Sequence, residues 1–171
     1  GVGGIPIAGA GNGTGTITLS GVSGTVTQAL LYWHGVDLAC CINTGSSDGI
    51  YDNPSVTING NPVTGISLGD GDRNGWGIFD TATSRLYRAD VTSVVTGNGS
   101  YLVSGLNAGA NHTANGASMV LIFDDGNQAN NRDLFILEGN DGNAPFLPPE
   151  PVGWQAVLSG FFYKNGTVNV Q

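Results

Sequence analysis

Ala29-Leu-Leu-Tyr-Trp33 and Met119-Val-Leu-Ile-Phe123 are the two longest uninterrupted apolar runs in the chain, and both end in an aromatic residue. A membrane-spanning helix needs roughly twenty such residues, so neither run is long enough to cross a bilayer. Short continuous runs of apolar residues are typical of strands that are covered on both faces. We therefore expect these two runs to form central strands of a β-structure.

Turn-forming dipeptides divide the rest of the chain into short pieces. Asn-Gly begins at positions 12, 59, 74, 98, 115 and 165, and Asp-Gly at 48, 70, 125 and 141. These dipeptides favour tight turns with positive φ. Between them the sequence predicts strands at 14–19, 26–34, 55–58, 62–68, 101–106, 117–124, 132–138, 155–163 and 167–170. The spacing predicts an all-β fold, a single antiparallel β-sandwich of the jelly-roll or immunoglobulin-like kind.

We expect very little helix, because no segment carries a sustained apolar stripe with a period of 3.6 residues. The best candidate is a single turn over 89–95, which Asp90 would cap. Two connections rich in Gly, Asn and Asp, at 38–53 and 69–77, are expected to project from the ends of the sandwich. Loops of this kind often carry function.

Size and charge restrict the classes of protein to which the chain can belong. Its 171 residues match one domain spanning 1–171, and 13 acidic against 5 basic residues give a formal net charge of −8. A phosphate backbone would be repelled, so nucleic acid is excluded as a partner. No transmembrane segment is expected. The first residue is Gly1 and not methionine, which predicts a processed, extracellular protein that is secreted or held at the cell surface.

The only two cysteines, Cys40 and Cys41, are adjacent. They therefore cannot join two distant segments of the same chain. Three alternatives stay open: a strained vicinal disulfide, a reduced pair, or interchain disulfides with neighbouring copies.

A loop near the middle of the chain has the pattern of a calcium ligand set. Asp70, Asp72 and Asn74 follow the D-x-D-x-N-G spacing of the first half of an EF-hand loop. Thr81 stands where an EF-hand has its bidentate glutamate, so a true EF-hand is excluded. A calcium site in a β-loop remains, against the alternative of a solvated turn. Trp76 would add a glycan-stacking surface beside it. The sequence indicates no required cofactor, and calcium is the one that this loop could bind.

Sequons for N-glycosylation begin at Asn12, Asn98, Asn111 and Asn165. A chain this rich in Asn, Ser and Thr contains roughly three such sequons by chance, so their number is not a signal. An extracellular location would nevertheless allow glycans at these sites.

Catalysis is not indicated. Residues 65–69 fit the G-x-S-x-G pattern of a nucleophile elbow, but the sequence DGDRNGWG that follows cannot begin the required helix. His34 and His112 are the only histidines, and neither lies in a recognisable catalytic context. We expect that the protein is not an enzyme.

Five segments resemble a family of secreted surface domains of bacteria and archaea. They are ALLYWHGVD (29–37), SVTINGNPV (55–63), YRADVTSVV (87–95), YLVSGLN (101–107) and GASMVLIFDD (116–125). In such domains similar patterns occur in the same order. The resemblance implies an extracellular β-sandwich used in surface structures, and it transfers no catalytic residue.

The N-terminal segment suggests how such a domain assembles. Residues 1–10 contain Val2, Ile5 and Ile7 in a Gly-rich, extended stretch, which could serve as a donor strand that completes the sandwich of an identical subunit. We thus expect a structural subunit of an extracellular filament or pilus-like appendage. Two alternatives remain: the segment folds back as an edge strand of a monomeric surface module, or the domain is a calcium-dependent adhesin or carbohydrate-binding module for glycans or a cell surface.

Overall fold

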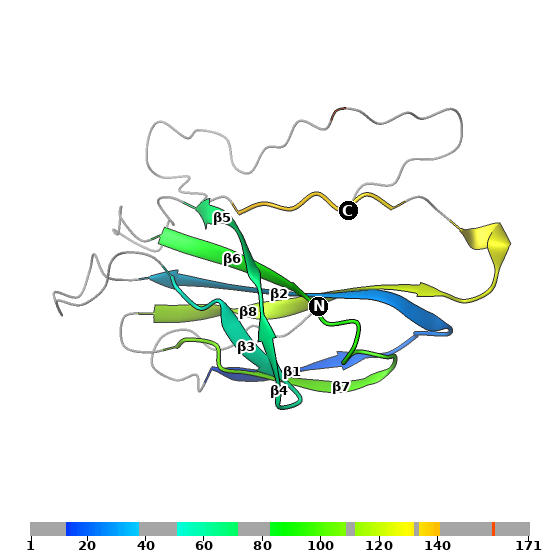
Figure 1. Cartoon of the computed structure of the whole chain (residues 1–171), viewed down its shortest axis with the longest axis horizontal. Helices are drawn as coiled ribbons and strands as arrows, with labels where there is room; N and C mark the ends of the chain where they lie inside the picture. The colour runs from blue at the N-terminus through cyan, green and yellow to red at the C-terminus, as the bar shows by residue number, and fades with distance from the viewer. Residues whose placement is uncertain are drawn as a thin grey trace, which may run out of the picture.

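The computed structural model describes residues 13–37, 51–71, 83–108, 112–131, 134–140 and 159. These residues form two antiparallel sheets of four strands each, which pack against each other as a sandwich (Figure 1). The described part of the chain contains no α-helix, and its single helical element is the 3₁₀ turn Gln128–Asn130. The prediction of an all-β sandwich with very little helix is confirmed.

The first sheet has the strand order β1-β7-β3-β4 and the second has the order β5-β6-β2-β8. The strands are β1 (Thr14–Leu19), β2 (Thr25–Asp37), β3 (Ser55–Ile58), β4 (Asn61–Thr64), β5 (Ile66–Gly71), β6 (Thr83–Asp90), β7 (Gly99–Ser104) and β8 (His112–Asp124). Asn59 and Gly60 have φ of 48° and 78°. They form the predicted two-residue turn of the β3–β4 hairpin, where Asn-Gly is favoured because both positions need positive φ.

The two apolar runs pair with each other in the second sheet. β2 and β8 are antiparallel, and Leu31 lies opposite Met119. β2 is central, as predicted, but the expectation that the second run is also central is wrong, because β8 lies at the edge of the described sheet. Val120 and Phe123 are each 37% exposed. An edge strand with apolar residues on its outward face gives the same continuous run as a fully covered strand, so the sequence could not separate the two.

The predicted strand 62–68 is two strands in different sheets. β4 ends at Thr64, β5 begins at Ile66, and Gly65 between them carries the chain from the first sheet to the second (Figure 1). The Gly65 amide donates to the Pro54 carbonyl at 2.8 Å. A Cβ atom on Gly65 would lie 2.4 Å from Cη2 of Trp33. The crossing thus depends on a residue without a side chain.

Gly65→Ala is expected to destabilise the protein by about 1–3 kcal/mol, because the indole of Trp33 must shift in a well-packed core. Urea unfolding measures the change. Gly97→Ala is the matched control, since a Cβ there meets no atom within 4 Å. Equal stability of the two variants would contradict a tight crossing at Gly65.

The single turn predicted over 89–95 is confirmed. Asp90 ends β6, its Oδ1 accepts from the Thr92 amide at 2.9 Å, and the Val95 amide donates to the Val91 carbonyl at 2.9 Å.

Two other expectations about secondary structure need correction. β6 was not among the predicted strands. Residues 134–138, within the predicted strand 132–138, are not in a strand. The predicted strands 155–163 and 167–170 lie outside the described residues, apart from Ser159, which is not in a strand.

The core between the sheets is built around aromatic residues from both. The Trp33 side chain is 1% exposed and its ring stacks on Tyr87 with centroids 5.6 Å apart. Its Nε1 donates to the Asn53 carbonyl at 2.8 Å. Tyr51 is also fully buried, and burial raises the pKa of its hydroxyl. These groups fix the segment before β3 against the second sheet.

Candidate functional site at the open strand edge

Two edge strands border one side of the sandwich. Among the described residues, β8 pairs only with β2 and β1 pairs only with β7. On the opposite side, β4 and β5 are consecutive in the chain and joined at Gly65. We call the side formed by β1 and β8 the open edge. The unpaired backbone of such an edge can accept another strand.

The inward face of β8 carries apolar side chains along the open edge. Ala117, Met119 and Leu121 lie opposite core-facing residues of β2. Ala117 is buried, whereas Met119 and Leu121 pack against the core and stay partly exposed. Leu19, at the end of β1, also packs against the core and stays partly exposed. An apolar strip is thus covered by the core from one side and accessible from the other.

Within the described residues, the strands of the open edge carry few of the features that prevent strand pairing. Natural edge strands carry charges, prolines or bulges that prevent pairing with another chain. β1 contains no charged residue and no proline. The stretch of β8 from Thr113 to Phe123 also contains no charged residue and no proline. β8 has one extra residue at Asn115, where the register shifts between His34 and Gly35, and the β2–β8 register shifts again between Val26 and Gln28, where the extra residue, Thr27, belongs to β2. The remaining residues of β8 present a long uncharged edge.

The outer face of the second sheet is crossed by residues 134–140, which we call the strap (Figure 1). Glu138 accepts from the Tyr32 hydroxyl and pairs with Arg88 Nη1 at 2.5 Å. Asn140 Nδ2 donates to the carbonyls of Ser84 at 3.1 Å and Gly69 at 3.2 Å. The strap is therefore held on β2, β6 and β5 by side chains. Sequence reasoning missed these contacts, since Tyr32 and Glu138 are 106 residues apart.

The ionisable groups under the strap are perturbed. Burial, followed by the hydrogen bond to Glu138, raises the pKa of Tyr32 to about 12. Burial acts to raise the pKa of Glu138, but the bonds from Tyr32 and Arg88 outweigh it and lower that pKa. The carboxylate therefore stays charged at neutral pH. It binds Arg88 and Tyr32 as a fixed anchor of the strap.

The two histidines lie in different surroundings. The Asn115 side-chain amide lies 3.0 Å from Nδ1 of His34, and burial lowers the pKa of His34, which is uncharged at neutral pH. His112 Nε2 lies 3.5 Å from a carboxylate oxygen of the buried Asp37. An imidazole next to a carboxylate is one part of a catalytic arrangement, and by itself it does not indicate a reaction. The absence of enzymatic activity stays a prediction.

The first residue of the calcium motif is engaged in an ion pair. Arg85 binds both carboxylate oxygens of Asp70, with Nη2 2.8 Å from Oδ2, and these bonds lower the pKa of Asp70. Asp72, Asn74 and Trp76 lie outside the described residues. In the part of the chain that is described, no group of three or more His, Cys, Asp or Glu side chains converges on a metal position. The calcium site stays a prediction.

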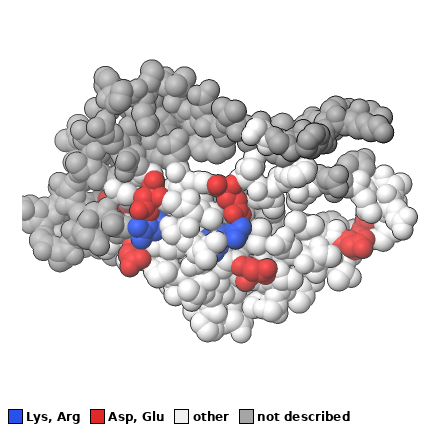
Figure 2. Space-filling model, turned by 45° about the horizontal axis from the view of Figure 1, so that its top comes forward, with Lys and Arg blue, Asp and Glu red and all other residues white. Residues whose placement is uncertain are grey.

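Carboxylates border the basic surface on this face of the molecule. In Figure 2 the blue atoms lie next to red ones. The arginines of the described residues are Arg85 and Arg88, and each forms an ion pair. The described surface therefore offers no free basic patch.

The other predicted sites are only partly covered by the structure. Asn98 is exposed, but its side-chain amide bonds both backbone groups of Val22, each at 2.9 Å, so it ties two turns together. The remaining predicted residues lie outside the described part of the chain: Asn12, Asn111, Asn165, Cys40, Cys41, Val2, Ile5 and Ile7. Their predicted roles are untested.

Comparisons with protein-family models, with curated proteins and with solved structures find no match to this chain. Among the described residues, no helix is long and apolar enough to span a membrane. The fold and the open edge are therefore the features of this protein that bear on its function.

Proposed function

We propose that this protein is a structural subunit of an extracellular filament or pilus-like surface appendage, in which identical subunits join by strand complementation. The observation that carries the proposal is the open edge: β8 is 13 residues long and, from Thr113 to Phe123, it has neither a charge nor a proline. A long, uncharged edge is costly for a protein that must stay monomeric. It suits a protein whose edge is filled by a neighbour.

The energetics favour an extended segment as the partner. Each backbone hydrogen bond added along β8 contributes roughly 0.5–1.5 kcal/mol. Apolar side chains of the incoming strand would cover Met119 and Leu121, which are partly exposed in the single chain. Completing the burial of such side chains contributes up to about 1.5–3 kcal/mol each. Because donor and acceptor are different surfaces, the contact repeats into a filament and does not close into a dimer.

The donor we propose is the segment 1–10 of a neighbouring subunit. Ile5 and Ile7 are two residues apart, so in an extended chain they point to the same side. That spacing matches the spacing of Met119 and Leu121 on the acceptor strand. The segment carries no charged side chain, so it introduces no charge into the apolar strip, and Pro6, which has no N–H, must direct its nitrogen away from β8.

Deletion of residues 1–10 is expected to give folded monomers that no longer polymerise. Negative-stain electron microscopy detects the fibres, and size-exclusion chromatography detects the monomer. A synthetic peptide of residues 1–10 should bind the truncated protein, whereas a peptide with Ile5→Asp and Ile7→Asp should not. Fibres formed by the truncated protein would exclude this donor.

A further inference from the structure

The strap presents large apolar side chains to solvent. Leu134, Phe135 and Leu137 are 60%, 66% and 57% exposed. Among the described residues, the exposed large apolar side chains outside the strap all belong to strands. The strap is therefore the place where exposed apolar side chains stand on a segment outside both sheets.

The polar contacts of the strap determine which of its side chains face solvent. Glu138 and Asn140 both bind the outer face of the second sheet. Figure 1 shows the strap as an extended segment, and in extended chains side chains two positions apart point to the same side. Phe135 and Leu137 therefore point away from the sheet, in agreement with their exposure. Ile136, on the side of the sheet, is less exposed, at 38%.

The backbone of the strap belongs to neither sheet. None of residues 134–140 lies in a strand, and among the described residues no backbone–backbone hydrogen bond joins the strap to a strand. Peptides that are bound in extended form are held by main-chain hydrogen bonds, and pockets read their alternate side chains. The exposure and hydrogen bonding of the backbone decide where a folded chain is cut. The strap already has the form in which an endopeptidase binds its substrate.

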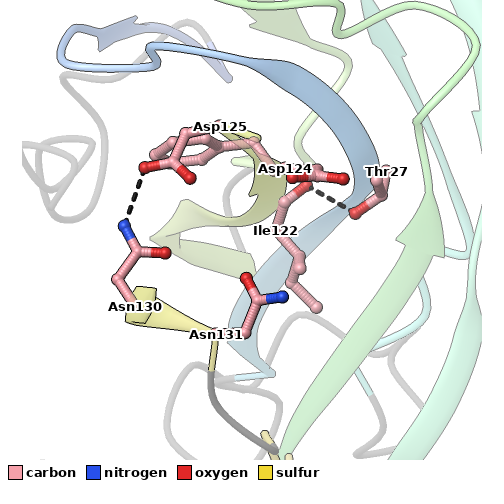
Figure 3. Close-up of a pocket in the computed structure, with 7 residues that line it drawn as sticks. Thr27, Ile122, Asp124, Asp125, Asn130 and Asn131 are labelled. Carbon is pink, nitrogen blue, oxygen red and sulfur yellow. Dashed lines mark hydrogen bonds between the residues drawn. The ribbon is translucent and has the colours of Figure 1, made fainter. Parts of the chain in front are cut away.

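The chain reaches the strap through a turn that is fixed after β8. Asp125 accepts from the Asn127 amide at 2.9 Å and from Asn130 Nδ2 at 2.8 Å, the second of which is drawn in Figure 3. Asn127 Oδ1 accepts from the Ala129 amide at 3.1 Å. All eight described strands precede this turn. A cut in the strap therefore breaks none of these strands, and it leaves the turn after β8 intact.

We propose that the strap is a proteolytic processing site for an endopeptidase whose S1 pocket accepts a large apolar side chain. Phe135 or Leu137 enters that pocket. Water is the co-reactant: the peptide C–N bond after the bound residue breaks, the carbonyl carbon gains a hydroxyl group and the new amine gains a proton. The cut separates the eight strands from the residues that follow. The open edge and residues 1–10 stay on one fragment, so the proposal does not rest on filament formation.

The test is limited digestion of the full chain with chymotrypsin under native conditions, followed by intact mass measurement. The first N-terminal product should end within residues 134–137, and its circular dichroism should keep the β-sheet signal. A triple variant with Leu134→Thr, Phe135→Thr and Leu137→Thr should be cut there at least about tenfold more slowly. Leu102→Thr is the matched control, because Leu102 is 46% exposed but paired within β7, and it should leave the rate unchanged.

Gly65→Ala separates cleavage of the folded protein from cleavage of the unfolded chain. This substitution weakens the core, far in sequence from the strap, and so raises the population of unfolded molecules. Because the strap is accessible in the folded protein, the rate of cleavage within 134–137 should change by less than about twofold. A rate that rises about tenfold or more would show that the chain must unfold before it is cut.

Two further results would overturn the proposal. One is a first cut outside residues 134–137. The other is an N-terminal product that loses its β-sheet signal, since the cut would then destroy the domain and would not process it. None of these results bears on whether the protein forms filaments.

Discussion

Met119→Lys is expected to abolish polymerisation while leaving the monomer folded. Met119 lies on the inward face of β8, opposite Leu31 of β2, and it is partly exposed at the open edge. A lysine there can extend its ammonium group out of the open edge into water, because its methylene stem covers the apolar surface. An incoming strand would close that route and bury the charge. The variant should therefore remain monomeric under conditions in which the unmodified protein forms fibres.

Ser118→Lys is the matched control for this variant. Ser118 is the next residue of the same strand, lies opposite Tyr32 and is exposed on the outer face. The added charge is the same, but it lies outside the strip that the incoming strand covers. Electron microscopy should show fibres for Ser118→Lys and none for Met119→Lys, with matching circular dichroism spectra. Fibres formed equally by both variants would place the subunit contact elsewhere.

Asn53→Leu is expected to cause the largest loss of stability, about 3–5 kcal/mol, because it leaves several buried polar groups without partners. The Asn53 residue is 8% exposed. Its Oδ1 accepts from the Tyr51 hydroxyl at 3.1 Å and from the Asn107 amide at 3.0 Å. Its Nδ2 donates to the carbonyls of Ser55 and Gly105, each at 3.1 Å. One amide thus connects the segment before β3 with the segment after β7.

Urea unfolding of Asn53→Leu measures this loss, with Asn61→Ala as the control. Asn61 is exposed, and its amide donates to the Ile58 carbonyl at 3.2 Å within the β3–β4 hairpin. Its replacement should cost about 1 kcal/mol or less. A small effect of Asn53→Leu would mean that the carbonyls and hydroxyls around Asn53 find other partners.

Local chemistry explains which strands could be predicted. β1 and β3 match the predicted ranges, because alternation and turn dipeptides mark both of their ends. β7 and β8 begin before their predicted starts, at Gly99 and at His112. β6 was missed because Arg85 and Arg88 interrupt its apolar pattern. Those charges are accommodated by Asp70 and Glu138, which are remote in sequence.

The candidate sites likewise divide into features that the sequence predicted and features that only the structure shows. The apolar content of 1–10 and of the run 119–123 was visible in the sequence, and it led to strand complementation as a hypothesis. The sequence could not tell which strand has an unpaired edge, because a central strand and an edge strand give the same apolar run. The contacts of the strap had no signal either, since Glu138 reaches Tyr32 and Arg88 from a distant part of the chain.

By itself the sequence determined the fold class, the β3–β4 turn at Asn59-Gly60 and the acidic character of the protein, because period-2 alternation, turn dipeptides and net charge act locally or through composition. Two other turn dipeptides were misleading, since Asp70-Gly71 lies inside β5 and Asn115-Gly116 inside β8. Only the tertiary structure decided the sheet order, the crossing at Gly65, the hydrogen bonds around Asn53, the contacts of the strap and the exposure of β8 at the open edge. These features arise from contacts between residues tens of positions apart. Which segment fills which edge depends on the packing of the whole chain, and no local pattern encodes it.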